Sequence, residues 1–417
     1  MKIAGSERWI VGAAIAGLVI RLAFAFLYWQ DKPLTHDERE YLALASSISA
    51  GRGLTYPAEH QTGTAQQFGR APGYPFFLAA IGVTDAEAAA TPASVKLVQS
   101  VIGGLGVLII GLIARRAAGP AAGLIAAVLA AVYPPLVWIC AYVLSETLYS
   151  TIALGVVLLL DVAIDRVQLS GSVRSMRAAA PTLAAGLASG AGILVRPAML
   201  VFVPLAVLWL ALHRRVGLAA VFAAAAVLVV APWTARNLRV YDRFVLVATE
   251  GGVTFWTGNH PLARGEGDLA ANPDIKAAEL RFREGHPGVS PEELEPMYYR
   301  EAAAYITAHP GRWLLLEARK VFYTIVPAGP SYTLHSTRYR VASIASYLLL
   351  LPFAVLGIRM WRRAHRPEAL LLLAASSVIV SLLFFPQERF RIPVIDPTVI
   401  VYAAIWCGSR VQTTSRF

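Results

Sequence analysis

Long apolar runs constrain this chain more than any other feature of its sequence. Hydrophobic residues make up 57% of the 417 residues and charged residues only 15%, whereas a soluble domain averages about 45–50% and about 25%. The runs are about 18–22 residues long, which is the length of a helix that crosses about 30 Å of hydrocarbon. The pattern excludes a soluble globular enzyme and a disordered chain, and it predicts an all-α polytopic membrane protein.

Ten runs are predicted to span the membrane, whereas the short run Gly73–Val83 is predicted to lie in or dip into the interface. With that run excluded, all the basic clusters of the connections fall on one side, which the positive-inside rule assigns to the cytoplasm together with both termini. The predicted spans are Trp9–Trp29, Val95–Ala114, Ala121–Ile139, Val143–Ile164, Thr182–Val195, Ala198–Leu212, Leu218–Trp233, Val341–Met360, Ala369–Phe385 and Ile392–Cys407.

Three parts of the chain follow from this topology. Residues 1–234 form a transmembrane module with an outer loop at 30–72, and residues 341–417 form C-terminal transmembrane helices. Between them, residues 235–340 are predicted to be an α-rich extracytoplasmic insertion. Its last helix, Trp313–Ile325, has the charges of an amphipathic helix on the membrane surface.

The formal net charge of +11 invites a nucleic-acid interpretation. No basic stretch interleaved with aromatic residues supports it, and basic cytoplasmic loops account for the charge, so no nucleic-acid partner is expected. Cys140 and Cys407 both lie in apolar runs without a CxxC pair. We expect them to be small buried hydrophobic residues rather than a disulfide or a thiolate metal site.

A pair of carboxylates begins the predicted helix after the first span. Thr35 and Glu38 have the spacing of a capping box, and Gly51 is a plausible stop, so a helix is predicted from His36 to about Ala50. Capping accounts for Glu38, whereas Asp37 gains only a small helix-dipole benefit. A carboxylate placed just above the membrane suits a general base acting on a lipid-bound substrate.

Further charged residues fall on the same outer side if the topology holds. They come from distant parts of the chain, and charges gathered at one surface suit chemistry on a lipid headgroup better than a transport pathway. These residues are Arg70, Glu146, Arg196, Arg236, Arg389 and Arg391.

The order of several short motifs resembles the polyprenyl-phosphate-sugar-dependent glycosyltransferases of the C-type membrane (GT-C) fold. The motifs are the Asp37-Glu38 pair, Arg70-Ala71-Pro72-Gly73-Tyr74-Pro75, Ser145-Glu146-Thr147-Leu148, Pro232-Trp233-Thr234-Ala235-Arg236-Asn237, Gly258-Asn259 and Arg389-Phe390-Arg391-Ile392-Pro393. The group that the motifs resemble comprises bacterial protein O-mannosyltransferases, aminoarabinose transferases and rhizobial galacturonosyltransferase-like proteins. Many relatives carry a soluble domain after the last span, whereas here about ten residues follow Cys407. Acceptor recognition that relies on such a domain is therefore expected to use residues 235–340 instead, or to be absent.

The resemblance implies a GT-C-like bundle and an enzyme that moves a sugar from polyprenyl phosphate to an extracytoplasmic lipid, glycan or protein. It implies a bacterial inner-membrane location, membrane lipids as neighbours and an active site facing the periplasm or exterior. Asp37 is carried over as the catalytic carboxylate, with Glu38 beside it. The residues expected to bind substrate are Tyr41, Arg70, Tyr74, Glu146, Arg196, Arg236, Asn237, Asn259, Arg389 and Arg391.

The implied reaction is an inverting displacement in which Asp37 takes the proton of an acceptor hydroxyl. Phosphate is a good leaving group that needs positive charge rather than a general acid, and guanidinium groups supply it. If the segment around Arg389 and Arg391 is extended, both side chains point the same way and meet one phosphate. No cofactor is required by the spacing, although Asp37, Glu38 and Glu146 offer oxygen ligands for a divalent cation.

Two other functions stay open from the sequence. A transporter or flippase of lipid-linked sugars would need polar groups through the bilayer and usually related halves, and neither is evident. A non-catalytic assembly protein needs only the apolar spans. The absence of a nucleotide-type Gly-rich phosphate loop agrees with a lipid-linked donor.

Overall fold

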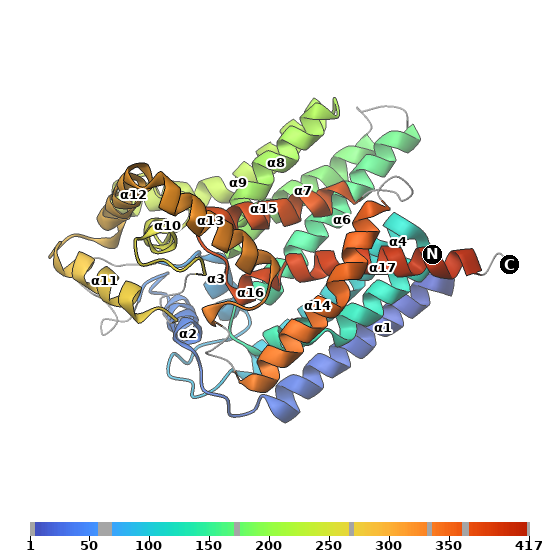
Figure 1. The fold of residues 1–417 in the computed structure, drawn as a ribbon, viewed down its shortest axis with the longest axis horizontal. Coiled ribbons are helices and arrows are strands. Elements are labelled where there is room, and N and C mark those ends of the chain that lie inside the picture. Colours follow the sequence, from blue (N-terminus) through green and yellow to red (C-terminus); the bar gives the residue numbers. More distant parts are fainter. Residues whose placement is uncertain are drawn as a thin grey trace.

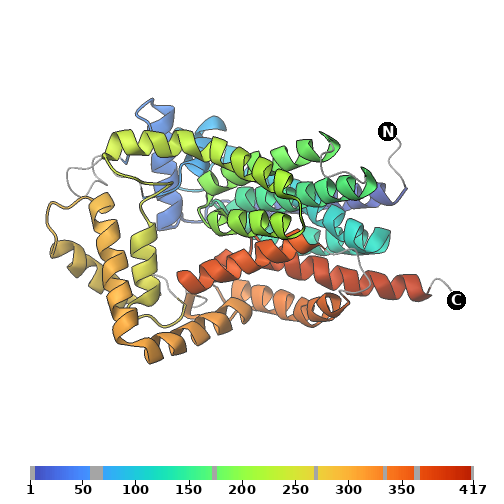
Figure 2. The ribbon, with the colours of Figure 1, turned by 90° about the horizontal axis from the view of Figure 1, so that it is seen from above.

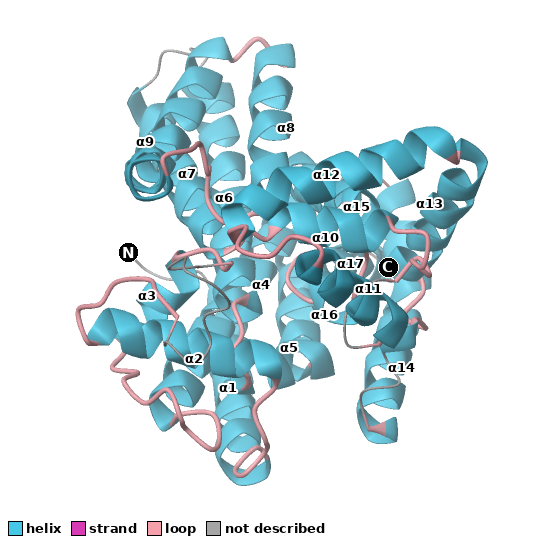
Figure 3. Ribbon diagram, turned by 90° about the vertical axis from the view of Figure 1, so that its left-hand side faces the viewer, coloured by secondary structure: helices cyan, strands magenta, loops and turns pink. Residues whose placement is uncertain are grey.

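The computed structural model describes residues 5–56, 69–170, 176–266, 271–331, 336–360 and 367–414. These residues form helices and loops, and no strand occurs among them (Figure 3). The prediction of an all-α fold is therefore confirmed. Residues 57–68, in the middle of the predicted outer loop, lie outside the described part of the chain.

The helices and helical turns carry the following bounds. In chain order they are α1 (Gly5–Ala23), η1 (Phe24–Tyr28), α2 (His36–Ser49), α3 (Gly73–Ala80), α4 (Ala93–Val132), α5 (Pro134–Trp138), η3 (Ile139–Ala141), α6 (Glu146–Ser170), α7 (Met176–Val195), α8 (Met199–Leu212), α9 (Val216–Tyr241), α10 (Gly251–Asn259), α11 (Pro273–Glu284), α12 (Pro291–Ala308), α13 (Pro310–Ile325), α14 (Thr337–Arg359), α15 (Glu368–Leu383), α16 (Glu388–Arg391) and α17 (Ile395–Thr414).

The long apolar helices lie side by side in a bundle (Figures 1 and 2). Within it α1 packs on α4, α6 on α7, and α17 on both α4 and α14. The start of α1 and the end of α17 lie at one end of the bundle, whereas α2, α3 and α10–α13 lie at the other end (Figure 2). We call this second end, with its short helices, the cap.

Six helices of the described residues are long and apolar enough to cross a membrane. The longest is α4, whose 40 residues would measure about 60 Å as one straight helix, twice the thickness of the hydrocarbon core. It breaks at Ala118 and Gly119, where φ of the glycine is 86°, just before Pro120. A Cβ added to Gly123 would lie 3.0 Å from the carbonyl oxygen of Gly111. The two halves therefore fold against each other, and α4 supplies two of the predicted spans.

The remaining predicted spans coincide with α8, α15 and α17, which have 14, 16 and 20 residues. The predicted end of the third span at Ile139 is wrong: α4 ends at Val132, before Pro134, and Ile139 belongs to the separate turn η3. Proline at that place lacks the N–H that would continue the helix. The short run after Gly73 forms only the eight-residue helix α3, which is too short to span.

The cap has a small hydrophobic core separate from that of the bundle. Trp256, Ile275, Leu294, Tyr298 and Ala302 bring α10, α11 and α12 together. The helix α9 continues to Tyr241, past the predicted boundary at residue 234.

The buried ammonium of Lys320 fastens α13 to the rest of the molecule. It lies 2.7 Å from the Glu317 carboxylate, and it donates to the Asn259 side chain of α10 at 3.1 Å and to the Leu382 carbonyl of α15 at 2.8 Å. A buried charge is stable only with such partners. Exposed apolar residues, among them Leu314 and Leu315, lie on the same helix. The helix is amphipathic, as predicted from its sequence.

Candidate active site

Asp37 lies between two arginines that come from distant parts of the chain. One carboxylate oxygen accepts a hydrogen bond from Arg70 Nη2 at 2.7 Å, and the other accepts one from Arg389 Nη2 at 2.5 Å. Burial raises the pKa of Asp37, but the charges of Arg389 and Arg70 outweigh it and hold the pKa well below its usual value. Asp37 is therefore a carboxylate at neutral pH.

Arg70 collects two further carboxylates around its guanidinium group. It lies 2.5 Å from Glu40, one turn after Asp37 on α2, and 3.2 Å from Glu250, just before α10. The ring of Tyr41 lies under the guanidinium group, with 5.2 Å between the Arg70 Cζ atom and the ring centroid. The loop before α3 thus places Arg70 beside three carboxylates, and these carboxylates fix the position of its guanidinium group.

A second ion pair adjoins the first at the start of α6. Glu146 pairs with Arg196 at 2.9 Å and lies 3.9 Å from Arg389. Glu146 is only 2% exposed, and its Oε2 atom has no hydrogen-bond partner among the described residues. Both arginines lie over the ring of Phe390. A buried carboxylate oxygen without a donor is available to a substrate hydroxyl.

The hydrogen bonds of Glu38 go to Thr35 and Val143, which gives it a structural role. It completes the predicted capping box with Thr35, whose backbone N–H and hydroxyl both donate to Glu38 Oε2. Its other oxygen accepts from the backbone N–H of Val143 at 2.9 Å, which ties α2 to the loop before α6.

We expect Glu38→Gln to lower the free energy of unfolding by about 1–3 kcal/mol, because an amide cannot accept on both sides. Turnover should change little, since the Glu38 oxygens are engaged by Thr35 and Val143. Thermal unfolding of the purified protein in detergent, together with turnover of the folded fraction, checks this. Loss of turnover in a well-folded Glu38→Gln variant would assign the base to Glu38 instead.

Asp37, Arg70, Glu146, Arg196 and Arg389 form one cluster, and the Tyr41 ring lies against Arg70 of this cluster. The other residues that were predicted to bind substrate lie outside it. The Tyr74 hydroxyl donates to Gln99, and the Asn237 amide donates to two backbone carbonyls, Val245 and Val247. The Arg236 guanidinium lies over the Trp233 ring.

Asn259 joins helices of the cap to the bundle rather than facing the cluster. It accepts from Lys320 and Trp313 and donates to the carbonyl of Leu383. These contacts hold the segment that leads from α15 towards α16.

Arg391 does not accompany Arg389, because the extended segment on which their meeting at one phosphate depended is not present. Residues Glu388–Arg391 form the short helix α16, in which side chains two apart point in different directions. Arg389 reaches Asp37, whereas Arg391 is buried against Asp396 at 2.6 Å and lies over the Tyr347 ring.

The sequence interpretation missed Glu40 and Glu250. The sequence spacing could have predicted Glu40 as a site residue, since it follows Asp37 by three residues and therefore shares its face of α2. No sequence pattern points to Glu250, because it lies in an irregular loop whose path depends on the packing of the cap. Gln387 was also missed; its side-chain oxygen accepts from Arg389 Nε at 3.1 Å.

His36, Asp37 and Glu40 are the group that offers ligands for a cation among the described residues. One ligand atom from each lies within 4.8 Å of the others. Two carboxylates and an imidazole suit a divalent ion such as Mn²⁺ or Zn²⁺. The trio of Asp37, Glu38 and Glu146 named from the sequence is not gathered in this way, because Glu38 is held by Thr35 and Val143.

Glu250 gives the cluster a pH dependence. Burial and the nearby charges of Glu40 and Asp37 outweigh the attraction of Arg70 and raise the pKa of Glu250 to about 7. A carboxyl whose pKa is higher in the folded state stabilises the fold at low pH, and that contribution is lost as the pH rises from about 4.5 to about 7.

We therefore expect Glu250→Gln to gain thermal stability relative to the wild type over this pH window, because glutamine does not titrate. Melting temperatures of both proteins between pH 4.5 and 8 check the expectation. A difference in melting temperature that is independent of pH would show that Glu250 titrates normally.

Comparisons with known proteins identify the fold. No protein-family model matches the chain, and no curated protein matches it in sequence. Two structures of the oligosaccharyltransferase AglB from Archaeoglobus fulgidus match 99% of the chain at 15% and 17% identity, with TM-scores of 0.59 and 0.60. The chain spans about half, 51%, of their length. One of these structures contains an inhibitory peptide and a dolichol-phosphate.

A weaker similarity connects the chain to ArnT from Cupriavidus metallidurans bound to undecaprenyl phosphate. It covers 97% of this chain and 78% of that protein at 16% identity, with a TM-score of 0.43 that is too low to support an argument. The chain is a multi-pass membrane protein with a GT-C-like fold.

Proposed function

We propose that this protein is a glycosyltransferase that takes a sugar from a polyprenyl-phosphate donor and passes it to an extracytoplasmic acceptor. The observation that carries the proposal is the position of Asp37 between Arg70 and Arg389. A carboxylate beside two guanidinium groups provides a base next to an anion-binding site. The cluster lies at the cap end of an apolar bundle, where a lipid phosphate would meet it.

In this proposal, donor binding changes the pKa of Asp37. A phosphate brings its own negative charge to Arg389 and Arg70, and it competes with Asp37 for their N–H groups. Because these two charges hold the pKa of Asp37 low, their withdrawal raises it towards its usual value and makes the carboxylate a stronger base. The ion pairs with Arg70 and Arg389 thus keep Asp37 a weak base until the donor binds.

The chemical step is a single displacement at the anomeric carbon. The acceptor oxygen attacks that carbon while its proton passes to Asp37, and the bond from the carbon to the phosphate oxygen breaks. Polyprenyl phosphate leaves with the bonding electron pair, and the guanidinium groups stabilise the negative charge that develops. The configuration at the anomeric carbon inverts.

Glu146 supplies the second part of the site. Its unpartnered Oε2 atom is oriented by the Arg196 ion pair on the other carboxylate oxygen. A sugar hydroxyl that donates to it would fix the ring of the donor beside Arg389. The acceptor approaches from the cap, which we place on the extracytoplasmic side because the arginine-rich connections lie at the opposite end of the bundle.

The proposal is tested by deleting the gene in its host and measuring lipid-linked sugars and envelope glycans by mass spectrometry. One polyprenyl-phosphate sugar should accumulate, and one sugar should disappear from an envelope glycan, lipid or protein. The wild-type gene should restore both, and a gene encoding the Asp37→Asn variant should restore neither. Restoration by the Asp37→Asn gene would favour a transporter or an assembly protein instead.

A further inference from the structure

The side chain of Asn259, which was predicted to bind substrate, already uses its full hydrogen-bonding capacity. The residue ends α10 and is only 1% exposed. Its side-chain amide donates to the carbonyls of Phe255 and Leu383 at 2.9 and 3.0 Å. Its side-chain oxygen accepts from Trp313 Nε1 and Lys320 Nζ, both at 3.1 Å. Two donated and two accepted bonds are all that an amide side chain can make, so the role of Asn259 lies in the segments that these bonds hold.

The bond to Leu383 fixes the last turn of α15 against α10. Lys320 reinforces it by donating to the neighbouring Leu382 carbonyl at 2.8 Å. The two backbones approach closely here, because a Cβ added to Gly258 would overlap the carbonyl oxygen of Phe384. Only glycine allows such an approach. The end of α15 is therefore closely fitted to the end of α10.

Arg389 follows Phe384 by only five residues, and ring contacts restrict the segment between them. The Phe384 ring meets Phe255 of α10 edge to face, with 6.3 Å between the ring centroids. The next ring, Phe385, stacks on Phe390 at 6.0 Å. The Phe390 ring in turn lies 5.5 Å from the Cζ atom of Arg389. The position of the α15 end thus determines where this arginine lies.

The opposite end of α10 contacts the other arginine of the site. Glu250 immediately precedes the helix and lies 3.2 Å from Arg70 Nε. One helix of nine residues, about 13.5 Å long, therefore connects the partner of Arg70 with the residue that holds the segment of Arg389. The helix lies among α11, α12 and α13, where Trp256 packs on residues of α11 and α12 (Figure 1). The cap thus sets the separation between the two arginines of Asp37.

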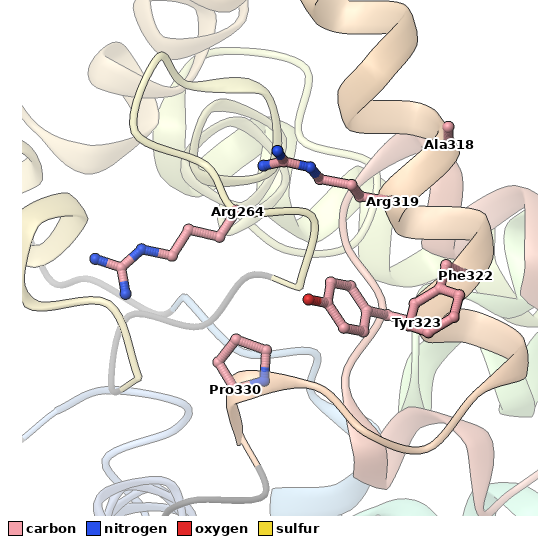
Figure 4. Close-up of a pocket in the computed structure, with 6 residues that line it drawn as sticks. All are labelled: Arg264, Ala318, Arg319, Phe322, Tyr323 and Pro330. Atoms are coloured by element: carbon pink, nitrogen blue, oxygen red, sulfur yellow. The ribbon is translucent and has the colours of Figure 1, made fainter.

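The contacts of Lys320 allow Asn259 to be replaced without leaving a buried charge unpaired. Lys320 is completely buried and also pairs with Glu317 at 2.7 Å. The other side of α13 faces outward, where it lines a hollow at the surface of the cap with Ala318, Arg319 and Phe322 (Figure 4). The ion pair with Glu317 stays when the oxygen of Asn259 is lost, so α13 keeps part of its attachment.

We propose that Asn259 is a positioning residue for sugar transfer: by holding the end of α15 against α10, it sets the place of Arg389 beside Asp37. The effect on transfer rests on the proposed function, whereas the placement of Arg389 stands without it. Because a misplacement of about 1 Å costs about 10²-fold in rate, the amide should matter to turnover although it lies outside the cluster.

The first experiment measures backbone hydrogen exchange by mass spectrometry on the full chain in nanodiscs of phosphatidylcholine. Asn259→Asp keeps an oxygen for Lys320 and Trp313 but cannot donate to Leu383, so it removes the bond in question and spares α13. Exchange of residues 384–391 should become about tenfold faster, the effect of losing one buried hydrogen bond.

Asn272→Ala is the matched control. This asparagine is also buried, and its amide makes the same kind of bond, to the Leu262 carbonyl, wholly within the cap. The variant should leave the exchange of residues 384–391 and the transfer rate as they are in the wild type. Changes equal to those of Asn259→Asp would show a general loosening of the cap and overturn the proposal.

The second experiment is a double-mutant cycle on single-turnover rates with saturating donor. Asn259→Asp should lower the rate by about 10²-fold when Arg389 is present. In an Arg389→Ala background it should lower the rate by less than about twofold, because no guanidinium group is left to place. A residue needed only for folding would lower the rate by the same factor in both backgrounds.

Unchanged exchange of residues 384–391 in Asn259→Asp would overturn the proposal, as would an equal loss of rate in the two backgrounds or no loss in either. Asn259→Ala repeats both measurements without the added charge and should agree; an effect of the aspartate alone would be charge repulsion and would also overturn it. If the wild type transfers no sugar while the exchange result holds, the proposed function fails and the placement of Arg389 by Asn259 stands.

Discussion

Replacing Asp37 by Asn should lower the turnover number by about 10²–10⁴-fold, the range that general-base catalysis contributes. The amide keeps the shape of the side chain but cannot take the proton of the acceptor. The variant should stay folded, because Arg70 keeps Glu40 and Glu250, and Arg389 keeps its contacts with Gln387 and Glu146. Melting temperature and membrane expression should therefore remain close to those of the wild type.

Single-turnover rates with saturating donor measure this effect on the chemical step itself. Glu38→Gln is the matched comparison, because the neighbouring carboxylate has structural contacts instead of arginine partners. The Asp37→Asn variant should lose rate, and the Glu38→Gln variant should lose stability. A fast Asp37→Asn variant would show that another group accepts the proton.

The two arginines of α16 should give opposite phenotypes although they are only two residues apart. Arg389→Ala should lower the turnover number by about 10²–10³-fold, the cost of removing one donor to a developing negative charge, in a protein that folds normally. Arg391→Ala should destabilise the protein by about 3–5 kcal/mol, because it leaves Asp396, which is fully buried, without its cation.

Lysine at the two positions sharpens the comparison. Arg389→Lys should restore turnover only in part, since lysine keeps the charge but loses the two-pronged geometry. Arg391→Lys should recover much of the stability. Arg300→Ala serves as the control for removing an exposed arginine. Measured turnover and melting temperature that change together in both alanine variants would show that α16 is only a structural turn.

The sequence predicted the bundle well because the bilayer imposes a simple rule on composition. Apolar length set the spans, and the reversal within α4 was expected from the charged pair Arg115-Arg116 between two apolar runs. Capping chemistry predicted α2 from His36, and the structure has it from His36 to Ser49. Such signals are local, so a single sequence carries them.

The site was less predictable because it depends on contacts between distant segments. The pairing of Arg389 with Asp37 joins residues that are 352 positions apart. From the sequence, Asp37 and Arg389 could be linked only by assuming that both lie on the same side of the membrane. The separate roles of Arg389 and Arg391 depend on four residues being helical rather than extended, a choice set by packing against α14 and α17 and not by their own pattern.

The central claim is that the Asp37 cluster releases a sugar from polyprenyl phosphate. The most direct measurement supplies the purified protein in nanodiscs with a panel of polyprenyl-phosphate monosaccharides and an envelope extract as acceptor, and it quantifies free polyprenyl phosphate by mass spectrometry. We expect release from one donor with the wild type, strict dependence on the extract, and almost none with Asp37→Asn. Equal release by the wild type and the Asp37→Asn variant, or none from any donor, would contradict the account.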